Sequence, residues 1–165
     1  MKTGMSDGGM DKWRALVAAE QEVARCRAEV NQLPSRVELL TKAMSGSSAW
    51  DRSTALTFLR LFPEDVPELL ELLVGLSLSI GWAQPAGEAI RAARREIDPS
   101  RLAEMVVGHL PDGDAEDYLR LADMLAHVEA WETLGVVIQR ALESSDLEIQ
   151  EVAHDFNESY GGMLP

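Results

Sequence analysis

Cysteine, aromatic residues and long uncharged apolar segments are scarce in this chain of 165 residues. Cys26 is its single cysteine, so no internal disulfide can form, which suits a reducing cytoplasm. The longest apolar run, LLELLVGLSLSIGWA from Leu69, is interrupted by Glu71 and two serines and is shorter than the roughly 18 to 20 uncharged residues that a bilayer span needs. We therefore expect a cytoplasmic protein without a membrane-spanning helix and without a membrane partner.

Positive charge is almost missing from the last third of the chain. The formal net charge is −13, from 28 acidic and 15 basic side chains. Residues 1–110 hold 15 acidic and 13 basic side chains, whereas residues 111–165 hold 13 acidic side chains and only two arginines, Arg120 and Arg140. This asymmetry argues against direct binding to nucleic acid or to anionic membranes. It favours either simple solubility or a cationic partner.

Catalytic motifs are also missing. The sequence has no Gly-x-Ser-x-Gly elbow and no glycine-rich loop that ends in Lys followed by Ser or Thr. Glu151 and His154 have the Glu-x-x-His spacing of di-iron helical bundles, but neither His109 nor His127 follows a glutamate by three residues. We therefore expect no enzymatic activity, no cofactor and no metal site. An enzymatic function stays open only if Glu151 and His154 are metal ligands.

The residues that are abundant, chiefly Leu, Ala and Glu, are typical of an all-α protein. We expect a disordered segment over residues 1–10 and N-terminal helices over residues 11–44, with Pro34 early in the second of them. Apolar or small residues recur there in steps of three and four, the spacing of one helical face, at Leu16, Ala19, Val23, Cys26, Val30, Leu33, Val37, Leu40 and Met44. We expect this stripe to pack on the rest of the same domain, with Cys26 as a small buried side chain. A dimeric coiled coil is the alternative.

A repeated pattern follows the SGSS linker at residues 45–48. The segments LLELLVGLS, LAEMVVGHL and LGVVIQRAL begin at Leu69, Leu102 and Leu134, which are 33 and then 32 residues apart. A period in the low thirties built from two helices is typical of stacked helical hairpins. We therefore predict that residues 49–160 form a helical-repeat domain, an α-solenoid of about four hairpins, with an irregular helical bundle as the alternative.

Residue pairs that cap helix N-termini agree with this division into helices. They are Asp98 with Pro99, Asp114 with Asp117, and Ser145 with Glu148, the last of which has the spacing of a full capping box.

One phrase of the sequence resembles a known repeat family. The run SDLEIQEVA is similar to the second-helix phrase of HEAT repeats, with Asp146, Ile149 and Ala153 at matching positions and Gln150 where the family has a basic residue. This resemblance implies a HEAT-like binding scaffold. Small acidic helical-repeat proteins are also similar to bacterial immunity proteins, which block cationic toxins such as nucleases. The resemblance therefore implies a non-enzymatic protein that neutralises a basic protein partner.

The last predicted helix, residues 146–160, has one apolar face and one acidic face. The apolar face consists of Ile149, Val152, Ala153, Phe156 and Tyr160. Like charges three or four residues apart on a helix cost about 0.2 to 0.5 kcal/mol per pair, so an acidic stripe without local compensation is a candidate binding surface. We predict that the residues that contact the partner are Asp117, Asp123, Glu148, Glu151, Asp155 and Glu158.

Two other interpretations of these features stay open. The acidic stripe is equally consistent with a solubility surface at the end of a repeat array, since terminal repeats need a polar outer face. The chain is also consistent with a scaffold or adaptor in which residues 11–44 act as a docking or self-association helix. The sequence does not determine the oligomeric state.

Overall fold

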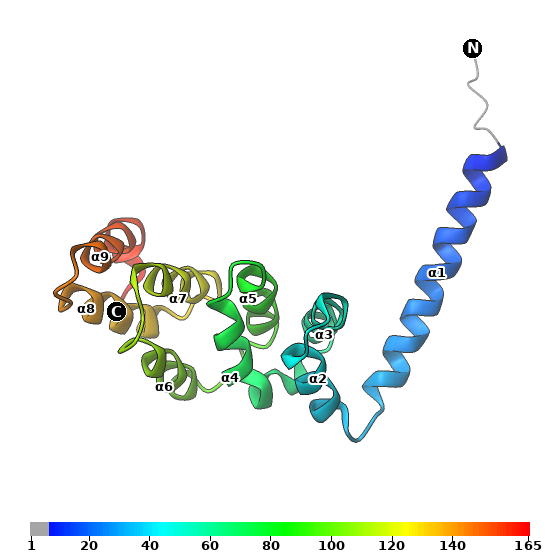
Figure 1. Cartoon of the computed structure of the whole chain (residues 1–165), viewed down its shortest axis with the longest axis horizontal. Coiled ribbons are helices and arrows are strands. Elements are labelled where there is room, and N and C mark those ends of the chain that lie inside the picture. Colours follow the sequence, from blue (N-terminus) through cyan, green and yellow to red (C-terminus); the bar gives the residue numbers. More distant parts are fainter. Residues whose placement is uncertain (1–6) are drawn as a thin grey trace, which may run out of the picture. The chain divides into compact units, whose positions relative to one another are not determined.

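The computed structural model describes residues 7–165, and this part of the chain is all-α, which confirms the predicted fold class. It contains nine α-helices, two short 3-10 helices and no β-strand (Figure 1). The elements are α1 (Asp7–Asn31), α2 (Arg36–Ser45), α3 (Ala49–Leu61), η1 (Pro63–Asp65), α4 (Val66–Ser77), α5 (Ala83–Ala92), α6 (Pro99–His109), α7 (Ala115–His127), α8 (Trp131–Leu142), α9 (Leu147–Tyr160) and η2 (Gly161–Met163). No helix among the described residues is long and apolar enough to cross a membrane.

The chain divides into two compact units, Met1–Glu38 and Leu39–Pro165. The predicted disordered segment, residues 1–10, falls partly on residues 1–6, which lie outside the described residues, while residues 7–10 belong to α1. In α1 the apolar stripe is exposed, with Leu16 at 52% and Val23 at 40% of their full accessible surface. Cys26 is exposed as well, so the prediction that it is buried is wrong. The reason is that the first unit contains one long helix and no second complete element to cover it.

The boundary between the units falls inside α2, earlier than the predicted linker at residues 45–48. Leu40 and Met44 of α2 are buried with the second unit. The linker itself is ordered, because Arg52 of α3 donates from Nε to the Met44 carbonyl at 2.8 Å and from Nη2 to the Gly46 carbonyl at 2.5 Å. Ser48 then caps α3 by accepting a hydrogen bond from the Asp51 backbone N–H at 3.1 Å.

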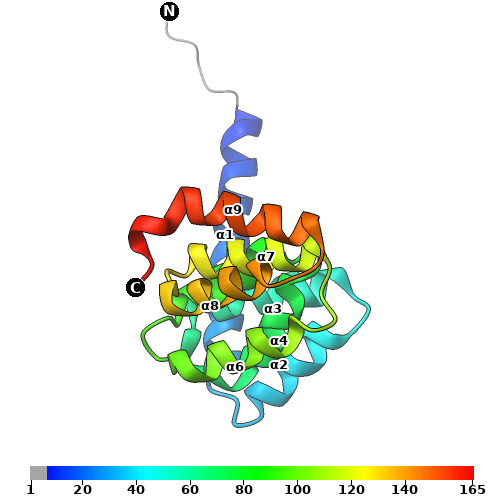
Figure 2. The ribbon, with the colours of Figure 1, turned by 90° about the vertical axis from the view of Figure 1, so that its left-hand side faces the viewer.

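Helices of the second unit form two rows. In one row α3 contacts α5, α5 contacts α7 and α7 contacts α9, and in the other α4 contacts α6 and α6 contacts α8 (Figure 1). Figure 2 views this unit from the end at which α8 and α9 lie. The three repeated segments fall in α4, α6 and α8, so three helix pairs are followed by α9. This order of contacts is compatible with the predicted solenoid.

The core of the second unit is made of leucines and of one helix with small side chains. Leu59, Leu73 and Leu125 have no accessible surface, and full burial of such a side chain contributes about 1.5 to 3 kcal/mol. On α5 the buried side chains are Ala86, Ala89 and Ile90, and this helix contacts α3, α4 and α7. Small side chains on α5 allow three helices to approach the same one closely.

We expect a fragment of residues 36–165 to fold on its own and a fragment of residues 49–165 to be clearly less stable. The shorter fragment lacks Leu40 and Met44, and loss of a buried Leu or Met side chain costs about 2 to 5 kcal/mol. Urea unfolding of both fragments, followed by circular dichroism, measures the difference. Equal free energies of unfolding would show that α2 is not part of the core.

Candidate acidic binding surface

The start of α9 is fixed by a cap and by a closed turn. Asp146 is the N-cap: its backbone is extended and its side chain accepts a hydrogen bond from the Glu148 backbone N–H at 2.9 Å. The predicted Ser145–Glu148 capping box is therefore wrong by one residue, because it is the Asp146 carbonyl that accepts the first helical bond, from the Gln150 N–H at 3.1 Å. The Gln150 side chain donates from Nε2 to the Ser144 carbonyl at 2.6 Å and closes the turn between α8 and α9.

The predicted apolar face of α9 is confirmed. Ile149, Ala153 and Phe156 are buried, and Val152 and Tyr160 are half-buried. The helix contacts α7 and α8. The Tyr160 ring lies 5.8 Å from the Phe156 ring and 5.8 Å from the Trp131 ring, measured between centroids, which joins the end of α9 to the start of α8. One side of α9 is thus held in place by burial.

The acidic stripe of α9, defined as Glu148, Glu151, Asp155 and Glu158, is exposed to solvent. Its members are three, four and three residues apart, so they follow one side of the helix. Among the described residues, none of these carboxylates forms an ion pair or accepts a side-chain hydrogen bond. No Lys or Arg occurs after Arg140 in the sequence, so neither α9 nor the segment after it supplies a compensating charge.

Arginines neutralise several carboxylates elsewhere in the chain. Glu129 pairs with Arg94 at 2.6 Å and with Arg91 at 3.4 Å. Glu88 pairs with Arg60 at 3.0 Å, and Glu116 pairs with Arg120. Some other exposed glutamates lack an ion pair but lie at a helix N-terminus, where the helix dipole favours negative charge. Asp155 and Glu158 have neither an ion pair among the described residues nor a favourable position in the helix dipole, since both lie in the C-terminal half of α9.

Two predicted partner-binding residues lie away from the acidic stripe, on α7. Asp117 belongs to a capping box: its backbone N–H donates to Asp114 Oδ1 at 2.9 Å, and its Oδ2 accepts from the Asp114 N–H at 3.3 Å. This confirms the predicted cap and gives Asp117 a structural role. Asp123 is exposed at a groove of about 320 Å³ between α5 and α7, where partial loss of solvent raises the pKa of its carboxyl group. Only the four α9 residues therefore share one surface.

A second cavity, of about 450 Å³, was not anticipated from the sequence. It is lined by residues that include Arg94, Ile97, Glu129 and Trp131. Glu129 follows α7 with a φ of 61°, in the left-handed conformation that usually favours Gly or Asn at a helix end. No sequence signal marks this position, because a glutamate there resembles any solvated charge. Its two ion pairs balance the charge of the cavity, which distinguishes it from the α9 surface.

The acidic stripe was compared with metal-binding arrangements and with known proteins. Within residues 7–165, no group of three or more His, Cys, Asp and Glu side chains is arranged to hold a metal ion. Glu151 and His154 are both exposed on α9. Comparison of the chain with protein-family models, curated proteins and solved structures gave no match. The acidic surface itself is therefore the feature of this chain that points to a function.

Substituting Asp146→Ala should lower the free energy of unfolding by about 1 kcal/mol, because the Glu148 N–H loses its acceptor. The neighbouring Ser145→Ala is the matched control and should change stability by less than about 0.5 kcal/mol, as expected for a surface side chain without a capping role. Thermal and urea unfolding of both variants provide the measurement. A larger loss for Ser145→Ala than for Asp146→Ala would contradict the assignment of the cap.

Proposed function

We propose that this chain is a non-enzymatic binding protein whose acidic α9 stripe contacts a basic protein partner. The observation that carries the proposal is the stripe itself: four exposed carboxylates without an ion pair among the described residues, on a helix whose opposite side is buried. The like charges at these spacings destabilise the helix by about 0.2 to 0.5 kcal/mol per pair. A cationic surface brought against the stripe would remove this repulsion.

In the proposed mechanism, electrostatic attraction accelerates the encounter and the stripe then covers a cationic groove. Complementary charge raises association rates and selects among partners. A basic enzyme that binds an anionic substrate, such as a nuclease, offers a groove of this kind, and the acidic stripe would occupy the place of the substrate. We therefore favour a toxin-immunity role in the cytoplasm, on a HEAT-like scaffold, with a solubility surface as the competing explanation.

A scaffold or adaptor role is the second candidate. Exposed apolar side chains on α1, such as Leu16 and Val23, favour it because they offer a contact surface of a different kind. A scaffold would have several weaker partners, whereas an immunity protein would have one tight, salt-sensitive partner.

The test compares two variants that remove the same number of charges from two different surfaces. The stripe variant carries Glu151→Gln, Asp155→Asn and Glu158→Gln. The control variant carries Glu64→Gln, Glu68→Gln and Glu71→Gln, which are exposed, lie four and three residues apart on η1 and α4, and form no ion pair among the described residues. Both variants lower the net negative charge equally.

The partner to assay is a basic protein encoded beside this chain, and its association is followed by stopped-flow or surface plasmon resonance. The stripe variant should associate at least about tenfold more slowly at low ionic strength, and the control variant nearly as fast as the parent. Added salt should narrow the difference, because the Debye length falls from about 10 Å at 0.1 M to about 3 Å at 1 M. Equal association rates for all three proteins would show that the stripe serves solubility alone. An equal decrease of the association rate in both variants would show that net charge, and not the position of the stripe, controls association.

A further inference from the structure

Helix α1 carries an exposed apolar seam with heptad spacing. Leu16, Val23 and Val30 occupy one position of the heptad, and Ala19 and Cys26 occupy the other, which gives alternating steps of three and four residues. These five residues are called the α1 seam. Residues 16–26 of the seam are exposed and Val30 is half-buried. The helix has 25 residues, so at 1.5 Å per residue it is about 37 Å long.

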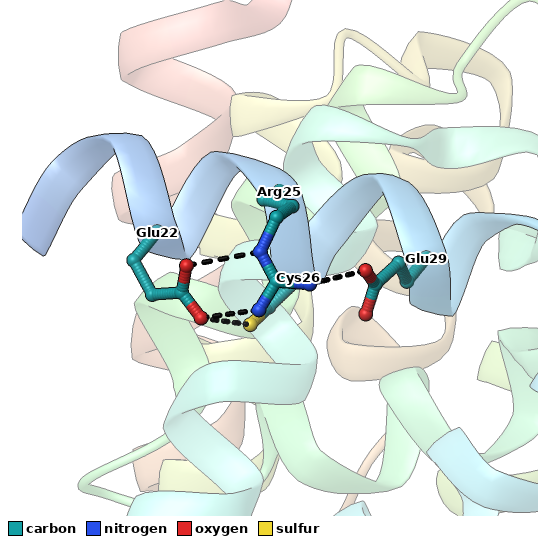
Figure 3. A network of polar contacts seen from close by, with 4 residues as sticks. All are labelled: Glu22, Arg25, Cys26 and Glu29. Atoms are coloured by element: carbon teal, nitrogen blue, oxygen red, sulfur yellow. Dashed lines mark hydrogen bonds and ion pairs between the residues drawn. The ribbon is translucent and has the colours of Figure 1, made fainter.

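Charged side chains flank the α1 seam on both sides, with Glu22 and Glu29 on one side and Arg27 on the other. On one side, Arg25 donates from Nε to Glu22 at 2.9 Å and also pairs with Glu29 (Figure 3). The Arg25 guanidinium lowers the pKa of Glu22 below its usual range. On the other side of the seam lies Arg27, which forms no ion pair among the described residues.

We propose that α1 pairs with α1 of a second copy of this chain as a parallel, in-register coiled coil. In this alignment Glu22 of one copy lies beside the seam and faces Arg27 of the second copy, which is five residues further along its helix. The two-fold symmetry makes this ion pair twice. In a parallel coiled coil, β-branched residues such as Val23 and Val30 at this heptad position favour two strands over three or four.

The opposite orientation is disfavoured by the same charges. An antiparallel alignment of the seam, with Val23 facing Cys26 of the second copy, brings Glu22 beside Glu29 of that copy on both sides of the symmetry axis. Like charges that face each other across an interface are repulsive. The antiparallel alignment also brings Arg27 beside Glu20 of the second copy, so its attractive and repulsive pairs offset each other. The parallel alignment has the attractive Glu22–Arg27 pairs without the repulsive ones and is therefore favoured.

The seam is short, so the dimer is expected to be weak and to depend on concentration. The α1 seam comprises fewer than the three to four heptads that are typical of a stable coiled coil. Ala19 and Cys26 also bury less apolar surface than leucine would. Partial dissociation in the micromolar range is therefore the expected behaviour, and measurements must span about 1 µM to 1 mM.

The first experiment measures the mass of the full chain by sedimentation equilibrium. We expect a monomer of 18.1 kDa at low concentration and a dimer at high concentration. Val23→Asp places two like charges in the seam and should raise the dissociation constant at least about tenfold. Val17→Asp is the matched control, since Val17 has 39% exposure against 40% for Val23 but lies outside the seam. Arg27→Glu should also weaken the dimer, whereas Arg27→Lys should not.

The second experiment reads the orientation from disulfide formation. Helix axes about 8 to 10 Å apart and a Cα radius of about 2.3 Å leave roughly 3.5 to 5.5 Å between facing Cα atoms, and the upper part of this range suits a disulfide. In a Cys26→Ser background, Leu16→Cys should therefore form a covalent dimer when diamide accepts the two electrons and two protons of the thiol pair. In an antiparallel dimer the two substituted positions would lie about 25 Å apart along the axis and would not cross-link.

Three results would overturn the proposal. The parent could remain a monomer across the whole concentration range, which would leave the seam to a different occupant, such as the second unit of the same chain. Val17→Asp could dissociate the dimer as strongly as Val23→Asp, which would place the interface elsewhere. The substituted Leu16→Cys position could fail to cross-link in a preparation that is dimeric by mass, which would exclude the parallel alignment.

Discussion

Close packing around α5 is the constraint on which the second unit depends. Ala86 and Ala89 have no accessible surface, and the helix that carries them contacts α3, α4 and α7. A larger side chain at either of these positions would displace fully buried neighbours, and overpacking of this kind typically costs about 1 to 3 kcal/mol. The spacing set by α5 determines where α7 lies, and α7 in turn supports α9. The acidic surface is therefore positioned by small side chains two helices away.

The two ends of the described chain offer opposite kinds of surface. At α9, apolar residues are buried and carboxylates remain exposed, which suits a partner of positive charge. At α1, apolar residues are exposed and the charges are largely paired within the helix through Arg25. We propose that the first surface gives selectivity by charge and that the second gives association by apolar contact.

Features set by local spacing could be predicted from the sequence, and those set by tertiary contacts could not. The three repeated segments fall in α4, α6 and α8, and the Asp114–Asp117 capping box is present, because helical periodicity and capping depend on neighbouring residues. The prediction that Cys26 is buried is wrong because the spacing of an apolar stripe does not show which element, if any, covers it. The choice of Asp146 over Ser145 as cap depends on where the backbone becomes extended, which residue type alone does not specify. Likewise, the sequence of the SGSS segment does not indicate that the Arg52 side chain donates hydrogen bonds to the Met44 and Gly46 carbonyls.

The acidic surface has one defining physical property: Glu151, Asp155 and Glu158 have no ion pair among the described residues and lie beyond the first turn of α9. The most direct measurement is the free energy of unfolding of the parent and of the variant with Glu151→Gln, Asp155→Asn and Glu158→Gln, at low and at high sodium chloride. Removing the like-charge pairs should make the variant more stable by up to about 1 kcal/mol at low salt. The difference should disappear at about 1 M salt, where screening acts over about 3 Å. A variant that is less stable than the parent at low salt would show that the carboxylates stabilise the fold, and would contradict this property of the surface.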